Sequence, residues 1–287
     1  MQHIPIRSIR PSHPAAVPTI DVHVRQLQAV LKGSRREESL HRHDFYFVLV
    51  VHRGAGSHEI DFVSYPVVDH TVFFVRPGQA HRLSLEASCT GYLVEFSADY
   101  VRRLNGLPKE LLRRASRHSV MYPEADQFDK ICGTIGSVIV EQETAALGNQ
   151  PAIDAYFSLL MIELARQSHT DANESAGQTA YALERYDELV HLIEQHLAQQ
   201  KLASDYARMM HMSPYQVNAL TMSLTGKTCS EIINECIITE AKRHLLATTE
   251  QVKEIAYYLG YEDPSYFIRY FKKHTGVSPE VFRRDYR

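Results

Sequence analysis

Short apolar runs separated by turn residues mark the chain from about residue 20 to residue 100. In the segment between two of these runs, Ile60 and Phe62 alternate with acidic residues, which is the two-residue period of a strand with one buried face. Glycine and proline punctuate the series. This pattern predicts a small antiparallel barrel or sandwich over residues 20–123. The apolar runs are Phe45–Val51, Thr71–Val75 and Thr90–Phe96.

From residue 124 to residue 168 the apolar positions change to a helical period, with a break at Gly148 and Pro151. The spacing of the first apolar stripe fits a seam between two subunits, and it equally fits a helix that covers the open side of the barrel. The first stripe is Phe128, Ile131, Ile135 and Val138, and the second is Ile153, Tyr156, Leu160 and Leu164.

Two segments lack any apolar period. Residues 1–19 contain four prolines and are expected to form an N-terminal arm. Residues 169–180 are small, polar and aperiodic, so they are predicted to link two domains.

The remaining residues, 181–287, have the pattern of short helices with explicit starts. Ser213, Asp263 and Ser278 each stand directly before a proline, which is a favoured pairing at the first residues of a helix. This part of the chain is therefore predicted to be all α-helical.

An internal repeat lies within this helical part. The stretches Pro214–Gly226 and Pro264–Gly276 have the same length, begin 50 residues apart and both end in Thr-Gly. Each follows a shorter helix across a tight turn, which predicts two helix-turn-helix units joined by one long helix. The residues expected to be buried are Val217, Leu220 and Leu224 in the first copy and Phe267, Tyr270 and Phe271 in the second.

Composition limits the class of protein. The 287 residues suffice for two domains, and 44% apolar with 23% charged residues is typical of a soluble globular protein. No apolar stretch approaches a membrane-spanning length and the N-terminus lacks a secretory signal, so a cytoplasmic location is expected. The four cysteines show no CxxC spacing, which favours reduced structural thiols.

Charge is unevenly distributed although the whole chain carries only −3. Residues 264–287 contain six Lys and Arg against two Asp and Glu, whereas residues 181–263 contain seven against twelve. Within this helical part, a net positive charge is thus confined to the second repeat and the C-terminus. By itself such a charged helix edge is usually a solvated surface, but within a duplicated helix-turn-helix it indicates a DNA contact.

The stretch VKEIAYYLGYEDPSYFIRYFKKHTGVSPEVFRRDYR, Val252 to Arg287, closely resembles the C-terminal signature of AraC/XylS-type transcription regulators. The resemblance covers roughly residues 181–287 and implies a double helix-turn-helix domain that binds double-stranded DNA. It is weaker at the first unit, where the family usually has basic residues and an aromatic. This chain has Ala219, Thr221, Met222 and Ser223 there.

The exposed faces of the two repeats supply the candidate DNA-binding residues. Arg269 is expected to read a base, and Lys272 and Lys273 are expected to contact phosphates. The first unit offers hydrogen-bonding groups but no cations, so it is expected to discriminate weakly while the second unit anchors. The full set is Tyr215, Gln216, Asn218, Thr221, Ser265, Ile268, Arg269, Lys272 and Lys273.

The N-terminal part resembles the cupin-like sensor domain that commonly precedes such a DNA-binding domain, through HRHDFYFVLVVHRGAGSH and Pro77–His81. Metal-binding cupins usually carry a glutamate four residues after the second histidine, where this chain has Phe47. We therefore expect no metal site, no cofactor and no catalytic residues. The candidate effector-binding residues are His41, His43, Tyr46, Arg76 and His81.

Alternatives remain for the barrel itself. It could be filled by Phe45, Phe47, Phe62 and Phe73 and bind nothing. The resemblance further implies that residues 124–168 mediate dimerisation.

The sequence as a whole predicts an α+β protein, with a cupin-like β-barrel or jelly roll, trailing helices and a C-terminal double helix-turn-helix. The expected function is sequence-specific transcription regulation by a homodimer that binds a small effector. The alternatives are a ligand-independent DNA-binding dimer and a metal-dependent cupin enzyme fused to a DNA-binding module.

Overall fold

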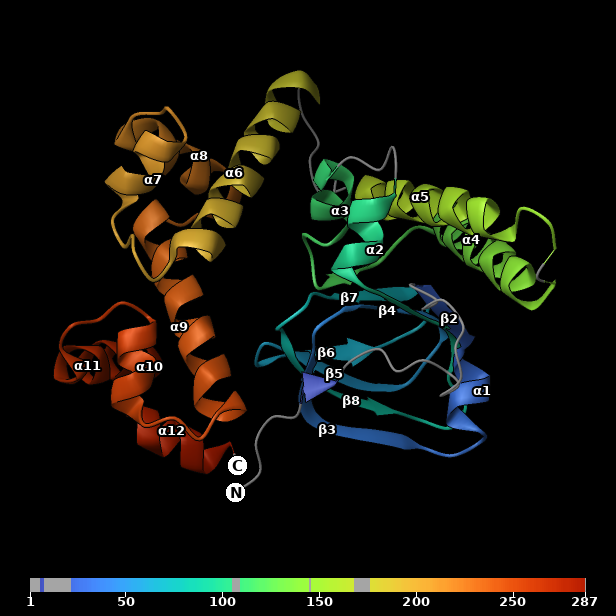
Figure 1. The fold of residues 1–287 in the computed structure, drawn as a ribbon, viewed down its shortest axis with the longest axis horizontal. Helices are drawn as coiled ribbons and strands as arrows, with labels where there is room; N and C mark the ends of the chain where they lie inside the picture. Colours follow the sequence, from blue (N-terminus) through green and yellow to red (C-terminus); the bar gives the residue numbers. More distant parts are fainter. Residues whose placement is uncertain (1–5, 8–21, 105–108, 145, 168–175, 287) are drawn as a thin grey trace. The chain divides into compact units, whose positions relative to one another are not determined.

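The computed structural model describes residues 6–7, 22–104, 109–144, 146–167 and 176–286. The chain divides into two compact units with a boundary between residues 171 and 172, and each unit is described by itself (Figure 1). Within these residues, no helix is both long and apolar enough to cross a membrane. Most of the predicted N-terminal arm lies outside the described residues.

The N-terminal unit is a sandwich of two five-stranded sheets followed by helices. One sheet has the strand order β1-β3-β8-β5-β6 and the other β10-β7-β4-β9-β2, with all neighbours antiparallel except β1 and β3. The strands are β1 (Ile6–Arg7), β2 (Val22–Gln26), β3 (Arg36–His43), β4 (Tyr46–Arg53), β5 (Gly56–Ile60), β6 (Val63–Val67), β7 (Thr71–Val75), β8 (Ala80–Leu85), β9 (Thr90–Phe96) and β10 (Val120–Met121).

The unbroken apolar run in β4 has a direct cause, because its sheet is buried on both faces. Leu49 and Val51 point into the space between the two sheets, whereas Val48 and Val50 point toward the helices. The helices of this unit are α1 (Leu27–Leu31), α2 (Ala98–Arg103), α3 (Lys109–Ala115), α4 (Ala125–Thr144) and α5 (Asn149–Gln167). The predicted β-sandwich with trailing helices is confirmed.

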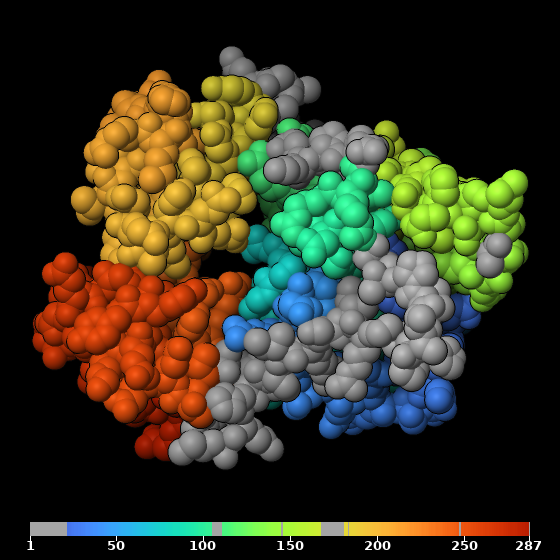
Figure 2. All heavy atoms as spheres, viewed as in Figure 1, coloured from blue at the N-terminus to red at the C-terminus, as the bar shows by residue number. Residues whose placement is uncertain are grey.

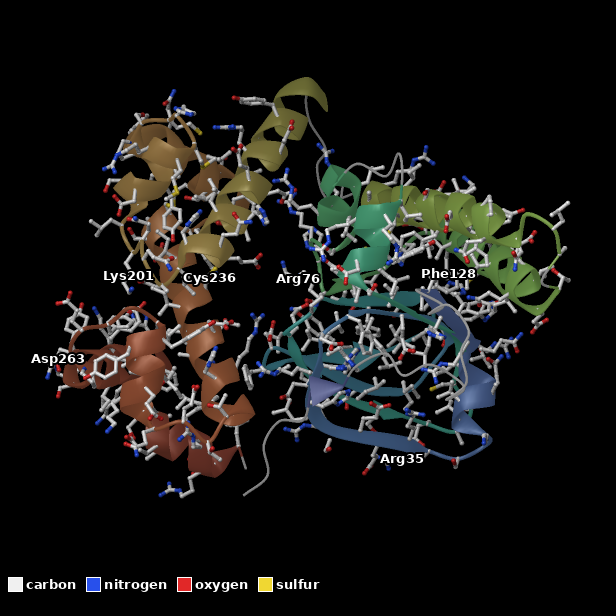
Figure 3. All side chains as sticks on the ribbon, in the orientation of Figure 1. Arg35, Arg76, Phe128, Lys201, Cys236 and Asp263 are labelled. Atoms are coloured by element: carbon white, nitrogen blue, oxygen red, sulfur yellow. The ribbon has the colours of Figure 1, made fainter. Side chains whose placement is uncertain are left out.

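Helices α4 and α5 cover the outer face of the β10-β7-β4-β9-β2 sheet (Figures 1 and 3). Phe128, Ile131 and Ile135 are fully buried in the core that α4 forms with this sheet. The stripe predicted as a possible subunit seam is therefore used inside the unit. In α5 the prediction for Tyr156 was wrong, because Phe157 takes the buried position between Ile153 and Leu160.

The C-terminal unit contains seven helices among its described residues: α6 (Ala176–His196), α7 (Ala203–Met209), α8 (Pro214–Thr225), α9 (Cys229–Ala247), α10 (Val252–Tyr258), α11 (Pro264–Thr275) and α12 (Pro279–Asp285). Residues 176–180 belong to α6, so the described part of the predicted linker is helical. The reason is that extending an existing helix adds a hydrogen bond for each residue fixed.

Helix α9 runs between the two helix-turn-helix units (Figure 1). The pair α7 and α8 lies at one end, and α10, α11 and α12 lie at the other. In the space-filling view, the earlier helices of this unit form a yellow-to-orange mass of atoms and the later ones an orange-to-red mass (Figure 2).

Candidate functional site

The second helix-turn-helix unit presents α11 as predicted. Asp263 lies at the start of α11 (Figure 3), where its carboxylate accepts a hydrogen bond from the backbone N–H of Ser265 at 2.8 Å. Phe267 and Phe271 are fully buried and fix the inner face of the helix. The inner face is therefore held by packing while the outer face stays open to a partner.

The outer face of α11 carries free-standing polar and basic side chains. Ser265, Lys272 and Lys273 are exposed, and Ile268 is half-buried. The guanidinium of Arg269 is 69% exposed and lies 3.8 Å from the carboxylate of Asp263. An ion pair this long and this exposed contributes little to stability, so Arg269 can leave it at little cost.

The first helix-turn-helix unit differs, because several of its candidate DNA-binding side chains already form hydrogen bonds within the protein. The side chain of Gln216 accepts from the backbone N–H of Ser213 at 2.8 Å, and Ser213 Oγ accepts from Gln216 N at 3.2 Å. This capping box starts α8. Gln216 was predicted as a base reader, but its amide oxygen is occupied by the cap.

Thr221 and Asn218 are also tied to the protein. Thr221 is fully buried and its hydroxyl donates to the carbonyl of Asn218 at 3.1 Å, so the exposed position predicted for Thr221 was wrong. Its Cβ falls on the same side as Leu220 and Val217, which pack into the core. Asn218 Oδ1 accepts from the backbone N–H of Cys229 at 3.2 Å, which ties α8 to the first turn of α9.

The exposed remainder of α8 is uncharged. Tyr215 is 83% exposed and Met222 is 45% exposed. Residues 214–225 contain no Lys or Arg. Lys227, just beyond the helix, lies 2.7 Å and 2.9 Å from the two carboxylate oxygens of Glu235. Of the two repeated helices, α11 therefore carries basic side chains and α8 carries none.

Helix α9 fixes both units. The Tyr270 hydroxyl of α11 donates to Asn234 Oδ1 of α9 at 2.8 Å, and Arg283 Nε of α12 donates to the carbonyl of Leu245 at 2.7 Å. Tyr270 is half-buried, less than predicted. The 19 residues of α9 span about 28 Å, which is close to the length of one turn of B-DNA, about 34 Å.

Four histidines meet in the interior of the N-terminal sandwich. His41, His58 and His81 are fully buried and His43 is 5% exposed. His81 Nε2 lies 2.7 Å from His43 Nε2, and His81 Nδ1 lies 2.9 Å from His58 Nε2. Burial lowers the pKa of His58 to about 3, with Glu38 opposing and His41 and His43 adding to the shift.

The structure brings together three of the five residues predicted to bind an effector. Tyr46 lies on the face of its sheet that points away from the histidines, in the core under the helices. Its ring is stacked on that of Phe96, with 4.9 Å between the centroids. Arg76 stands in the turn after β7, where its backbone N–H donates to Gln79 Oε1 at 2.7 Å. Sequence alternation alone could not assign these faces.

Aromatic rings fill the space beside the histidines. His43 lies 4.2 Å from Phe45 and is stacked on Phe47 at 5.5 Å, and His58 lies 4.8 Å from Phe73, measured between ring centroids. These rings pack directly against the histidines. The alternative in which the barrel is filled named Phe45, Phe47, Phe62 and Phe73, of which Phe45, Phe47 and Phe73 are buried in this core and Phe62 is half-buried.

A groove of about 390 Å³ lies elsewhere on this unit, between α4 and the ends of β2, β4 and β9. Its size falls within the range of small-molecule sites, about 300–1,000 Å³. The polar lining residues include Gln26, His52, Arg53, Thr90 and Tyr92, and Cys132 closes it from α4. All four cysteines of the chain are free, and burial raises the pKa of the Cys132 thiol to about 11, with Asp129 adding to it.

Two family descriptions match the chain. Residues 31–189 match the AraC-like ligand binding domain, and residues 206–285 match a helix-turn-helix domain. The first match alone covers more than half of the 287 residues.

Individual relatives are distant but extend over most of the chain. The HTH-type transcriptional activator RhaS of Enterobacter sp. (strain 638) is 24% identical over 85% of this chain and 87% of its own length. The HTH-type transcriptional activator RhaR of Mannheimia succiniciproducens is 20% identical over 85% of this chain and 86% of its own. Among solved structures, ToxT from Vibrio cholerae O395 covers 92% of this chain and 97% of its own at 14% identity, with a TM-score of 0.43.

Proposed function

Because the chain belongs to the AraC family of DNA-binding transcription regulators, we propose that it reads DNA through two recognition helices of unequal character. Helix α11 anchors the protein and reads at least one base through Arg269. Helix α8 adds weak discrimination through Tyr215 and the uncharged groups beside it. The observation that carries this proposal is the exposed basic face of α11 beside the uncharged face of α8.

The length of α9 supports binding to successive major grooves on one face of the DNA. A rigid helix of about 28 Å joins the two units, and side-chain hydrogen bonds hold both recognition helices against it. The counterion-release part of the affinity then comes from α11 and α12.

Activation is the direction of regulation that we propose, because the relatives of this chain are named transcriptional activators. The N-terminal unit is proposed to bind a small effector. The groove between α4 and the sheet, rather than the space at the histidines, is the candidate location because aromatic rings fill the latter.

We also propose a homodimer formed through the α4–α5 hairpin, as the family resemblance implies. The apolar stripe of α4 is buried in the unit, so a contact between subunits would use the outer residues of the hairpin. Val140 and Leu159 are apolar and exposed there.

Selection of bound duplexes from a random DNA library, repeated with and without an extract of cell metabolites, tests this function. We expect enrichment of one motif with two half-sites. Recovery of duplexes with no shared sequence would contradict sequence-specific binding. A motif and affinity unchanged by any extract would favour the ligand-independent alternative.

A further inference from the structure

The buried histidines have an acidic neighbour that the sequence pattern did not reveal. Ring nitrogens of His41, His43 and His81 lie within 4.8 Å of one another. Glu38 Oε2 lies 3.3 Å from His41 Nε2, and the Glu38 side chain is only 12% exposed. Three imidazoles and one carboxylate therefore gather at one place inside the N-terminal sandwich.

A β-bulge in β3 places Glu38 on the side of the histidines. Glu38 pairs with Leu83 of β8, and His41 pairs with His81, so β3 advances by three residues while β8 advances by two. Residues three apart in a regular strand point to opposite faces. The extra residue of the bulge restores Glu38 and His41 to the same face.

Hydrogen bonds around the cluster fix which atoms face inward. A carbonyl oxygen can only accept, so His41 Nδ1 donates to the carbonyl of Ser39 at 2.8 Å. In the neutral ring this leaves His41 Nε2 with a lone pair directed at the Glu38 carboxylate. Arg36 Nε donates to Glu38 Oε1 at 2.5 Å, which orients Oε2 toward the histidine.

This arrangement resembles the outer shell of a metal site. Metal-binding histidines usually donate their second ring N–H to a carbonyl, a carboxylate or another group that fixes the tautomer. Two lone pairs that face each other at 3.3 Å repel unless a proton or a cation lies between them. His58 holds His81 in the same way, since the His81 Nδ1 to His58 Nε2 distance is 2.9 Å.

The donor set fits a transition-metal ion. With bonds of about 2.0–2.1 Å, a tetrahedral zinc ion needs ligand nitrogens about 3.3 Å apart. The separations here run from 2.7 Å between His43 and His81 to at most 4.8 Å, so small side-chain rotations would suffice. Imidazole and carboxylate ligands favour zinc and similar borderline ions over magnesium or calcium.

We propose that His41, His43, His81 and Glu38 bind a divalent transition-metal ion inside the sensor unit. Phe47 occupies the position expected for the cupin glutamate, and Glu38 replaces that carboxylate from an earlier residue of β3. A bound ion cross-links β3 and β8 and stabilises the unit. The site is independent of DNA binding, so its test can fail without affecting the proposed regulatory function.

The test uses the full chain, stripped with a chelator and titrated with zinc chloride by calorimetry and by thermal unfolding. We expect one zinc ion per chain and a higher melting temperature of the N-terminal unit. Glu38→Gln, which keeps the side-chain shape, should weaken zinc binding at least about 10-fold, and His81→Gln should abolish it. The matched control is His191→Gln, at an exposed histidine of α6, which should bind zinc as the unaltered chain does.

A failure of the unaltered chain to bind zinc would overturn the proposal, as would full affinity in both Glu38→Gln and His81→Gln. A second measurement needs no variant. The cobalt-loaded chain should show the intense visible absorption of a four-coordinate ion, and zinc should remove it. A spectrum equal to that of hydrated cobalt would also overturn the proposal.

Discussion

The candidate DNA-binding side chains of α8 and α11 differ in how strongly they already interact with the rest of the protein. The amide groups of Gln216 and Asn218 hold helix ends together, whereas the guanidinium of Arg269 makes only a long exposed ion pair. A side chain that the fold does not use can reorganise on DNA at little cost. Arg269 is therefore the side chain on which sequence discrimination should depend most.

Replacing Arg269 by Ala should remove the preference for one base pair of the bound site. A bidentate arginine–guanine contact is worth about 1–3 kcal/mol against the wrong base pair, so this variant should lose preference at one position of the selected site. Competition binding with single-base variants of that site measures the loss. An unchanged preference at every position would show that Arg269 does not read a base.

The double change Lys272→Ala with Lys273→Ala should act on all DNA alike. Two lost phosphate contacts lower the slope of log affinity against log salt by about 2, and affinity for selected and scrambled duplexes should fall equally. Fluorescence anisotropy at several salt concentrations measures both. Lys130→Ala, at an exposed lysine of α4, serves as the control and should leave the slope unchanged.

Gly260 stands where any side chain would push the neighbouring backbone at Ala198 out of its place. Its φ is 75°, and an added Cβ would lie 1.7 Å from the carbonyl oxygen of Ala198. Gly260→Ala should therefore destabilise the C-terminal unit by about 3 kcal/mol or more, since the left-handed backbone and the displacement both contribute. Urea unfolding measures this.

Gly276→Ala is the matched control for Gly260→Ala. Gly276 has a φ of 82° but no atom within 4 Å of an added Cβ. Gly276→Ala should lower the free energy of unfolding by only about 1–2 kcal/mol, the cost of the left-handed conformation alone. Equal losses in the two variants would contradict the close approach of Gly260 to Ala198.

At the scale of elements, α9 connects the two recognition helices through hydrogen bonds of side chains. Asn218→Ala leaves the buried backbone N–H of Cys229 without its acceptor, which should cost about 1 kcal/mol of unfolding free energy. It should also weaken DNA binding, because α8 loses its tie to α9. Tyr215→Ala, at a residue of α8 that is 83% exposed, should change DNA binding without changing the melting temperature.

Thermal unfolding and anisotropy of the two variants separate these roles. If Asn218→Ala unfolds at the same temperature as the unaltered chain, the proposed tie between α8 and α9 contributes nothing. The comparison also explains why Asn218 alone is a poor probe of base reading.

The outer face of the α4–α5 hairpin is the place to test dimer formation. Val140→Glu combined with Leu159→Glu should give a monomer with an unchanged melting temperature, because both side chains are exposed. Ile135→Glu should instead unfold the unit, since Ile135 is fully buried against the sheet. Light scattering after gel filtration decides, and a dimer that survives the double change would refute this interface.

Local patterns predicted most elements of this chain. Ser213, Asp263 and Ser278 cap helices where the sequence placed them, and each accepts a hydrogen bond from a backbone N–H of the first turn. Such caps and the period of apolar residues are properties of a few neighbouring residues, so one sequence suffices to find them.

Features set by pairing between distant strands escaped prediction. The bulge that turns Glu38 toward His41 depends on the register with β8, and alternation in the sequence alone assigns Glu38 to the wrong face. Likewise, Tyr46 faces the helices and not the histidines. Both faces of its sheet are covered, so the continuous apolar run of β4 does not show which face Tyr46 takes. Thr221 looked exposed since a hydroxyl gives no sign of burial when it bonds its own helix.

At the scale of the whole molecule, the chain combines a helix-turn-helix unit whose two repeated helices differ in charge with an AraC-like ligand-binding unit that has four histidines in its otherwise apolar interior. The family assignment rests on matches in both units. We propose that two helix-turn-helix units on one rigid helix contact successive grooves of the DNA, and that α11 makes the stronger contact.

A hydroxyl-radical footprint of the full chain on its selected duplex tests this claim most directly. We predict that each bound chain protects two patches about 10 base pairs apart on one face of the DNA, so that the proposed homodimer protects two such pairs. The Lys272→Ala and Lys273→Ala double change should weaken the patch under α11 first within each pair. One single patch for each chain, or paired patches that respond equally to that change, would contradict two-groove contact with α11 as the stronger reader.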